Sequence, residues 1–116
     1  MALAKRIAVT LPAGPRIEDT VSRIQWAEEQ GIADAWFSDS GAPDTLTQVA
    51  AIAHQTKNIR IGTAVTPVYT RSPSVLAASA NVIGQLLPDR FVMGLGSSSQ
   101  TLSLIHISEP TRPLDI

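Results

Sequence analysis

Polar residues follow three apolar segments of this sequence, and they are the residues that could carry chemistry. The stretch FSDSGAPD contains Asp39 and Ser40, and GLGSSSQT holds two glycines and three serines in eight residues. A third stretch, GTAVTPVYTRSP, lies between these two. Backbone N–H groups beside glycine and serine hydroxyls can together face an anion or a polar ring. We therefore interpret the three stretches as candidate ligand-binding loops.

Gly94 and Gly96 also match the start of the dinucleotide-binding pattern GxGxxG. Ser99 stands where the third glycine of that pattern is required, and within the strand and helix repeat no acidic residue follows at the distance that ribose binding needs. Taken alone, the two glycines indicate only a strand that ends tightly.

Four apolar runs of strand length carry these stretches at their ends. They read as nearly unbroken apolar segments, which is typical of strands buried on both faces of a parallel sheet. The predicted strands cover residues 6–11, 34–39, 59–65 and 90–95.

Amphipathic stretches between the runs predict helices. The first helix ends before Gly31, Asp44 or Thr45 is expected to cap the second, and the third begins with Ser72 as its cap and Pro73 at its first position. The apolar stripes at helical spacing are Ile17, Val21, Ile24 and Ala27 in the first helix, and Leu46, Val49, Ala50 and Ala53 in the second.

The predicted strands begin near residues 6, 34, 59 and 90, a repeat of about thirty residues. This is the length of a βαβ unit, in which parallel strands are joined by right-handed crossovers. Two α/β architectures accept four such units, an open doubly wound sheet and half of an eight-stranded barrel. In both, ligands bind at the carboxyl ends of the strands, where the candidate loops lie.

Composition excludes several other classes. The chain has 116 residues, a net charge of −1, no cysteine and 44% hydrophobic residues. Without a basic run, a nucleic-acid surface has no support, and without cysteine there is neither a disulfide framework nor thiolate chemistry. No apolar run reaches the roughly 18 residues of a membrane helix. We expect a cytoplasmic α/β protein that binds neither nucleic acid nor membrane.

The segment IGTAVTPVYTRSPSVLAASANVIGQLLPDRFVMGLGSSSQT resembles the luciferase-like monooxygenase superfamily, which comprises flavin and deazaflavin oxidoreductases. The family pattern is Gly-Thr-x-Val at a strand end, then Arg-x-Pro opening an alanine-rich helix, then Arg-Phe-x-x-Gly-x-Gly. The matching positions are Gly62, Thr63, Val65, Arg71, Pro73, Arg90, Phe91, Gly94 and Gly96. The earlier stretch ADAWFSD fits the second strand of the family, and the resemblance covers about residues 5–101.

The resemblance implies the first half, about four βα units, of a TIM (β/α)8 barrel over residues 1–101. It also implies an oxidoreductase that uses FMN or the deazaflavin coenzyme F420, acts on a small molecule by hydride transfer or monooxygenation, and forms a homodimer when intact.

The resemblance further assigns cofactor-binding residues. A bulge with a non-proline cis peptide is expected at Ala64–Val65, where it would support the flavin or deazaflavin ring, and Asp39 is expected near the polar edge of that ring. The loop expected to contact the ring or its phosphate tail contains Ser97, Ser98 and Ser99. The alternatives are an ordinary strand end, an aspartate that caps the next turn, and a simple polar loop.

One position departs from the deazaflavin-dependent members of the family. Several of them carry histidine directly after the aspartate of the second strand, and this chain has Ser40 there. An imidazole acid or base is therefore absent at this place, and no catalytic residue is assigned. Trp26 and Trp36 are expected to be packing groups, His54 a surface residue, and Arg71 a structural residue that caps carbonyls or pairs with an acid.

The last fifteen residues, LSLIHISEPTRPLDI, follow no period that joins them to the preceding repeat. Residues 102–112 match, one after another, a translated reading frame of the transposon-end adaptor used in sequencing libraries. We therefore expect residues 102–116 to be an artefactual tail rather than a domain; the alternative is a genuine strand at LSLIHI.

Four strands would leave two open edges and half of a barrel core. We expect the chain as written to be inactive. The function from another class that fits the sequence is a non-catalytic half-barrel interaction module that pairs through its edges.

Overall fold

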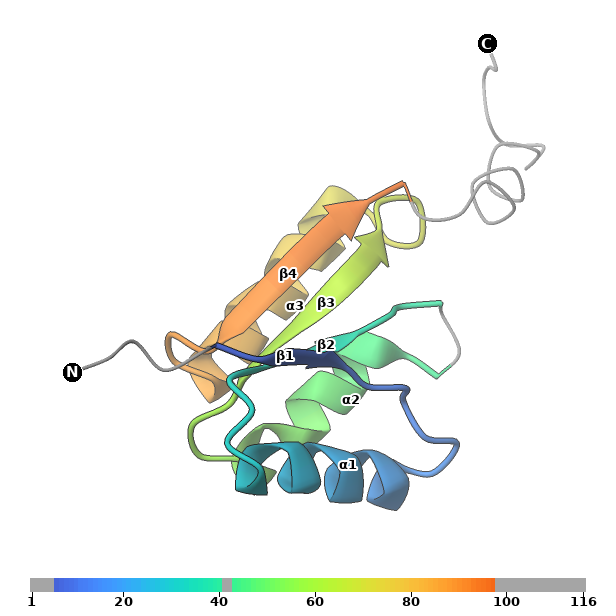
Figure 1. Ribbon diagram of the computed structural model, residues 1–116. Coiled ribbons are helices and arrows are strands. Elements are labelled where there is room, and N and C mark those ends of the chain that lie inside the picture. The colour runs from blue at the N-terminus through green and yellow to red at the C-terminus, as the bar shows by residue number, and fades with distance from the viewer. Residues whose placement is uncertain (1–5, 41–42, 98–116) are drawn as a thin grey trace, which may run out of the picture.

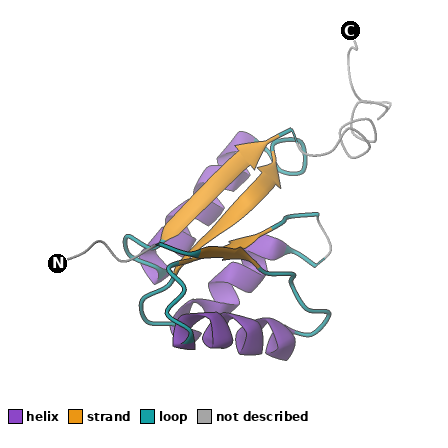
Figure 2. Cartoon of the chain, viewed as in Figure 1, coloured by secondary structure: helices purple, strands orange, loops and turns teal. Residues whose placement is uncertain are grey.

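The computed structural model describes residues 6–40 and 43–97. Within these residues the chain alternates strands with helices and forms one four-stranded sheet (Figures 1 and 2). The strands are β1 (Ala8–Thr10), β2 (Asp34–Phe37), β3 (Arg60–Pro67) and β4 (Phe91–Gly96). The helices are α1 (Ile17–Glu29), α2 (Thr45–Ile52), the short 3-10 helix η1 (Ala53–Gln55) and α3 (Pro73–Leu86).

The order of the strands decides between the two architectures that the sequence left open. Each strand pairs in parallel with the next one along the chain, in the order β1-β2-β3-β4. A doubly wound sheet reverses its strand order at a switch point and carries helices on both faces. Here the described order has no reversal, and α1, α2 and α3 lie on one face of the sheet (Figure 1). The winding is that of a βα barrel.

The hydrophobic core lies between this sheet and its helices. Side chains alternate along each strand, so that Ala35, Phe37 and Ile61 are buried towards the helices. They pack in one cluster with helix residues that include Ile24 and Ile83. The opposite face of the sheet carries the residues paired across the four strands in register, namely Thr10, Trp36, Gly62 and Val92.

Two packing predictions for α1 were wrong. Trp26 is 52% exposed and Ile17 is 40% exposed, whereas Ile24 and Ala27 are buried. Trp26 directly precedes Ala27, and successive helix residues are rotated by about 100°, so its ring cannot share the buried stripe. The hydroxyl of Thr20 is buried instead and donates to Gln48 Oε1 at 2.9 Å.

The predicted strands and helix caps are confirmed in position and differ at their ends. β1 is shorter than the predicted residues 6–11. Leu11 N donates to the carbonyl of Trp36 at 2.9 Å, and the pairing ends there because the next residue, Pro12, has no N–H. The third helix begins as predicted, with Ser72 Oγ accepting from Val75 N at 3.3 Å and Pro73 in its first turn. Asp44 occupies the N-cap position of α2 as predicted, but its side chain makes no capping hydrogen bond to the helix backbone.

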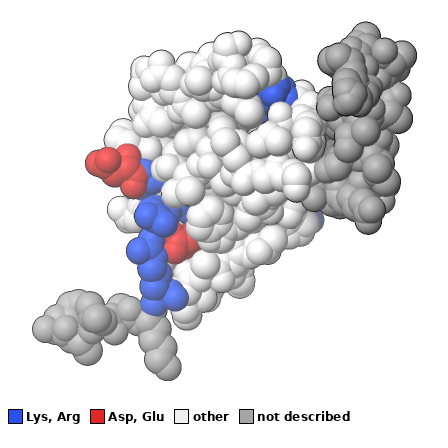
Figure 3. Space-filling model, turned by 90° about the horizontal axis from the view of Figure 1, so that it is seen from above, with Lys and Arg blue, Asp and Glu red and all other residues white. Residues whose placement is uncertain are grey.

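Ionic contacts fix the amino-terminal ends of three strands. Asp34 on β2 accepts from Arg6 Nε at 2.7 Å and from Arg60 Nε at 2.8 Å. The hydrogen bond from Arg6 outweighs the burial of the carboxylate and, with Arg60, lowers the pKa of Asp34 to about 2. Figure 3 shows charged side chains gathered at one end of the molecule, while most of the rest of that face is uncharged. No helix within residues 6–40 and 43–97 combines the length and the apolarity of a membrane span.

A second polar contact fixes the start of β3. Glu28 Oε2 accepts from three successive backbone N–H groups, those of Lys57 at 2.8 Å, Asn58 at 2.5 Å and Ile59 at 3.0 Å. Burial opposes the ionised form of Glu28, but the three N–H groups and Arg90 outweigh it, so the pKa of Glu28 lies below its usual range. This carboxylate therefore ties α1 to the turn that leads into β3.

We predict that Glu28→Gln lowers the free energy of unfolding by about 1–2 kcal/mol at neutral pH, because an amide is a weaker acceptor than a carboxylate for three N–H groups on a partly exposed site. A group with a lowered folded-state pKa stabilises the fold above its unfolded pKa and stops doing so as the pH falls. The difference from wild type should therefore shrink below about pH 4. Urea unfolding measures both effects. Glu29→Gln, at an exposed neighbour, is the control and should change little.

Candidate functional site

β3 carries a bulge opposite Gly94 of β4. Thr63 pairs with Met93 and the next pair is Thr66 with Leu95, so that two residues of β3, Ala64 and Val65, stand against one residue of β4. The Ala64–Val65 peptide bond is cis. The bulge and the cis peptide that the family resemblance implied are both confirmed.

Two buried threonine hydroxyls hold the strands on either side of the bulge. Thr63 Oγ1 donates to the carbonyl of Gly94 at 3.2 Å and accepts from Gly94 N at 3.1 Å and from Thr66 Oγ1 at 2.9 Å. A hydroxyl has one proton and two lone pairs, so the Thr63 hydroxyl is fully satisfied. No role was predicted for Thr66, although the Thr-x-x-Thr spacing in the third predicted strand and the residue after it is present in the sequence.

Gly94 and Gly96 let β4 pass close to the bulge. A Cβ atom at Gly94 would collide with the backbone carbonyl oxygen of Thr63, and one at Gly96 would lie 3.0 Å from Cγ2 of Val65. The interpretation of these glycines as residues of a tight strand end is therefore confirmed. The bulge at Ala64 and Val65 is the feature that requires them.

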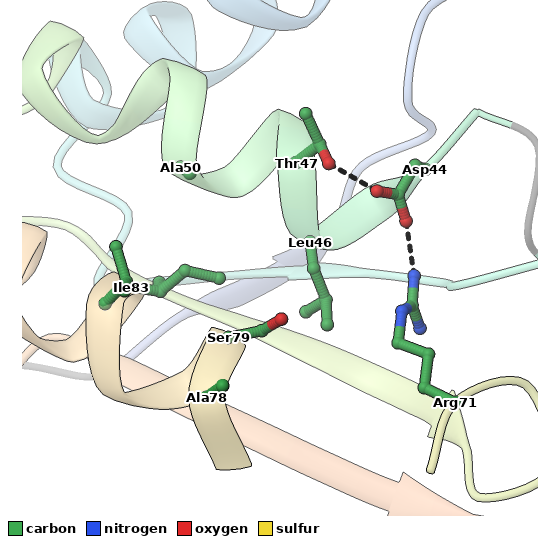
Figure 4. Close-up of a pocket in the computed structure, with 9 residues that line it drawn as sticks. Asp44, Leu46, Thr47, Ala50, Arg71, Ala78, Ser79 and Ile83 are labelled. Carbon is green, nitrogen blue, oxygen red and sulfur yellow. Dashed lines mark hydrogen bonds and ion pairs between the residues drawn. The ribbon is translucent and has the colours of Figure 1, made fainter. Parts of the chain in front are cut away.

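Asp39 connects the bulge to the loop before α3. Its backbone N–H donates to the carbonyl of Val65 at 3.4 Å, and its fully buried carboxylate pairs with Arg71 Nη1 at 2.9 Å. Arg71 also pairs with Asp44, which accepts from the Thr47 hydroxyl (Figure 4). Burial opposes the charge of Arg71, but the two carboxylates outweigh it and raise its pKa. The prediction that Arg71 pairs with an acid is confirmed.

The remaining predicted site residues have different surroundings. Ala64 is exposed, Val65 is half-buried, and Ser97 is exposed directly after β4. Ser98, Ser99 and the tail at residues 102–116 lie outside the described residues. Ser38 was not predicted; its hydroxyl donates to the carbonyl of Ala64 at 3.5 Å. His54 is exposed, as expected. The described residues contain no His, Cys, Asp and Glu cluster that could hold a metal ion.

Two cavities border this region. One, of 360 Å³, lies between the loops that follow β1 and β2, and its lining residues are Thr10, Leu11, Pro12, Ala13, Ser38, Ser40, Pro43 and Thr45. The other, of 420 Å³, lies between α2 and α3 (Figure 4), and its lining residues are Asp44, Leu46, Thr47, Ala50, Arg71, Ala78, Ser79, Val82 and Ile83. Arg71 thus borders the cavity between α2 and α3, while its guanidinium reaches the buried Asp39.

A family model described as luciferase-like monooxygenase matches residues 1–110. The chain belongs to the luciferase-like monooxygenase family. An F420-dependent glucose-6-phosphate dehydrogenase of Amycolatopsis mediterranei (strain U-32) is 34% identical over 105 residues, which are 82% of this chain and 31% of that protein. A 5,10-methylenetetrahydromethanopterin reductase of Methanolobus tindarius is 32% identical over 75 residues, 64% of this chain and 23% of that protein.

Solved structures of the family share the fold. The coenzyme F420 dependent tetrahydromethanopterin reductase from Methanopyrus kandleri has a TM-score of 0.77 at 21% identity, over 84% of this chain and 28% of that one. The oxygenating constituent of 3,6-diketocamphane monooxygenase from Pseudomonas putida, in complex with FMN, also has a TM-score of 0.77 at 21% identity, over 89% and 32%. The chain spans about a quarter to a third of the length of these relatives. Its described residues, with four parallel strands and three α-helices, have the fold of the first half of their TIM-type barrel.

We predict that Gly94→Ala destabilises the protein by about 1–3 kcal/mol, because the added methyl group must displace the Thr63 carbonyl and loosen the bulge. Gly84→Ala is the matched control. Nothing lies within 4 Å of a Cβ atom at Gly84 on α3, and alanine in a helix is favoured over glycine by about 0.5–1 kcal/mol, so this variant should be neutral or more stable. Equal losses of unfolding free energy for the two variants would contradict the close approach at Gly94.

Proposed function

We propose that this chain is the amino-terminal half of a flavin- or deazaflavin-dependent oxidoreductase, in which the β3 bulge supports the ring of the cofactor. The observation that carries the proposal is the bulge itself. It exposes Ala64 in the carboxyl-terminal half of β3, and hydrogen bonds of Thr63, Thr66 and Asp39 hold the backbone around it. Ligands bind at this end of the strands in βα barrels. Cofactor contacts are proposed for Ala64, Val65, Ser97, Ser98 and Ser99. Asp39 is proposed to lie near the edge of the ring and to support the bulge, since its own carboxylate is fully buried against Arg71.

The residues around the bulge fit a flat ring with an apolar face and polar edges. Ala64 and Val65 offer small apolar side chains, and Ser38 lies beside them through its contact with the Ala64 carbonyl. The carboxylate of Asp39 is turned inward to Arg71, so it adds no negative charge to the surface near Ala64. When bound, the coenzyme supplies the redox chemistry, and this half of the protein orients the ring and excludes water from one of its faces.

Two cofactors fit the proposal, coenzyme F420 and FMN. The sequence relatives named above are an F420-dependent dehydrogenase and a methylenetetrahydromethanopterin reductase, which supports F420 and a hydride transfer. The FMN complex of the diketocamphane monooxygenase supports FMN and an oxygenation for the same fold. The substrate is a small molecule held by parts of the barrel that this chain does not include. The chain alone is proposed to be inactive.

We predict that the full-length protein containing this segment binds F420 or FMN, and that Ala64→Leu weakens this binding at least about tenfold by occupying the face on which the ring would lie. Fluorescence titration measures the dissociation constants. Ala77→Leu, at an exposed position of α3, is the control and should leave the affinity unchanged. Binding of neither coenzyme by the wild-type protein would reject the proposal and favour a non-catalytic interaction module.

A homodimer of the intact protein and a cytoplasmic location complete the proposal. The cavity between α2 and α3 supports the dimer, because apolar side chains are exposed beside it. Val82, which lines the cavity, is 55% exposed, and Val75 on the same helix is 49% exposed. Exposed apolar side chains grouped on one surface favour association with another protein surface.

We also propose that residues 102–116 are translated adaptor sequence and that the natural domain segment of this chain is 1–101. The match of residues 102–112 to the adaptor reading frame supports this, although the family match extends to residue 110. Resequenced genomic DNA should show a reading frame that continues past residue 101 with different codons. The same tail in genomic DNA would overturn this proposal and leave the cofactor proposal intact.

A further inference from the structure

Arg71 lies between two carboxylates with different exposure to solvent. The side chain of Asp39 is 0% exposed, that of Arg71 is 15% exposed and that of Asp44 is 53% exposed. The first pair is therefore enclosed by protein, whereas the second faces the cavity between α2 and α3 (Figure 4). Ion pairs at exposed positions contribute little, but removing one partner of a buried pair leaves an uncompensated charge.

The contacts of Arg71 form a continuous connection from α2 to the bulge. Asp44 is the N-cap residue of α2 and pairs with Arg71 Nη2. Arg71 Nη1 holds the carboxylate of Asp39, and the backbone N–H of Asp39 holds the carbonyl of Val65 in the bulge. One guanidinium thus joins the loops that follow β2 and β3 to the start of α2. Its planar fork of donors allows this, and the single ammonium of a lysine cannot bridge both carboxylates in the same way.

Loss of the Arg71 charge would act on the bulge through Asp39. A buried carboxylate without a cation is strongly disfavoured, so the segment around Asp39 would have to move towards water. The same movement would withdraw the Asp39 N–H from the Val65 carbonyl. Loss of Asp44 would leave the buried pair in place and expose only the outer side of Arg71.

We propose that Arg71 is a positioning residue for the cofactor site: it holds Asp39 in the interior and thereby fixes the carbonyl of Val65 and the shape of the bulge. Arg71 itself would not contact the cofactor. The role in cofactor binding rests on the proposed function, whereas the coupling of Arg71 to Asp39 and the bulge does not.

The test compares Arg71→Gln and Arg71→Met with Asp44→Asn in the full-length protein. Amide hydrogen exchange of Asp39, measured by NMR without any coenzyme, should accelerate at least about tenfold in either neutral variant of Arg71, because its hydrogen bond to Val65 opens locally. In Asp44→Asn the rate should change by less than about threefold. Arg71→Lys should restore slow exchange in part. Two neutral variants are used so that one that fails to fold does not remove the comparison.

The second measurement is the dissociation constant for F420 or FMN, whichever the wild-type protein binds. The neutral variants of Arg71 should weaken it at least about tenfold and Asp44→Asn by less than about threefold. Unchanged exchange at Asp39 in the Arg71 variants would overturn the coupling. Faster exchange with an unchanged dissociation constant would overturn the positioning role and leave Arg71 purely structural. Binding of neither coenzyme by the wild type would reject the proposed function, while the exchange rates would still decide the coupling.

Discussion

The pairing of β3 with β4 around the bulge is the constraint on which the candidate site depends. Two residues of β3 stand against Gly94, and the ladder resumes at Thr66 and Leu95. The close approach of the strands leaves no room for a side chain at Gly94. The Thr63 hydroxyl accepts from Gly94 N, and the Val65 carbonyl accepts from the N–H of Asp39. A bulge bends its strand and re-aims its side chains, and here it leaves Ala64 exposed at the end of the sheet where βα barrels bind ligands.

The two ends of the sheet are held by different interactions. At the amino-terminal end, Arg6, Asp34 and Arg60 join three strands, and Glu28 ties α1 to the turn before β3. At the carboxyl end, the one described ion-pair network, Asp39–Arg71–Asp44, joins loops rather than strands. This division agrees with the general behaviour of βα barrels, in which one end supplies stability and the other carries the site.

Local sequence patterns predicted the strands and helices. The same patterns were wrong about burial where it depends on the direction in which a side chain leaves its helix. Apolar runs located the four strands, and Ser72 with Pro73 located the start of α3, because capping and proline geometry are decided by adjacent residues. Trp26 was expected in the core and is exposed, because its neighbour Ala27 takes the buried position on α1. The bulge at Ala64–Val65 was found through a family resemblance, since no local period marks it.

The sequence by itself determined the alternation of strands and helices, since this is carried by residues close together in the chain. Its family pattern indicated the family, and through the family the position of the bulge. Only the tertiary structure decided the strand order, which excluded the doubly wound sheet, and the partners of Asp39 and Glu28. Arg71 is 32 residues from Asp39, and Glu28 is 29 to 31 residues from the N–H groups it accepts. Such contacts follow from how right-handed crossovers stack successive βα units, and no spacing within one unit reveals them.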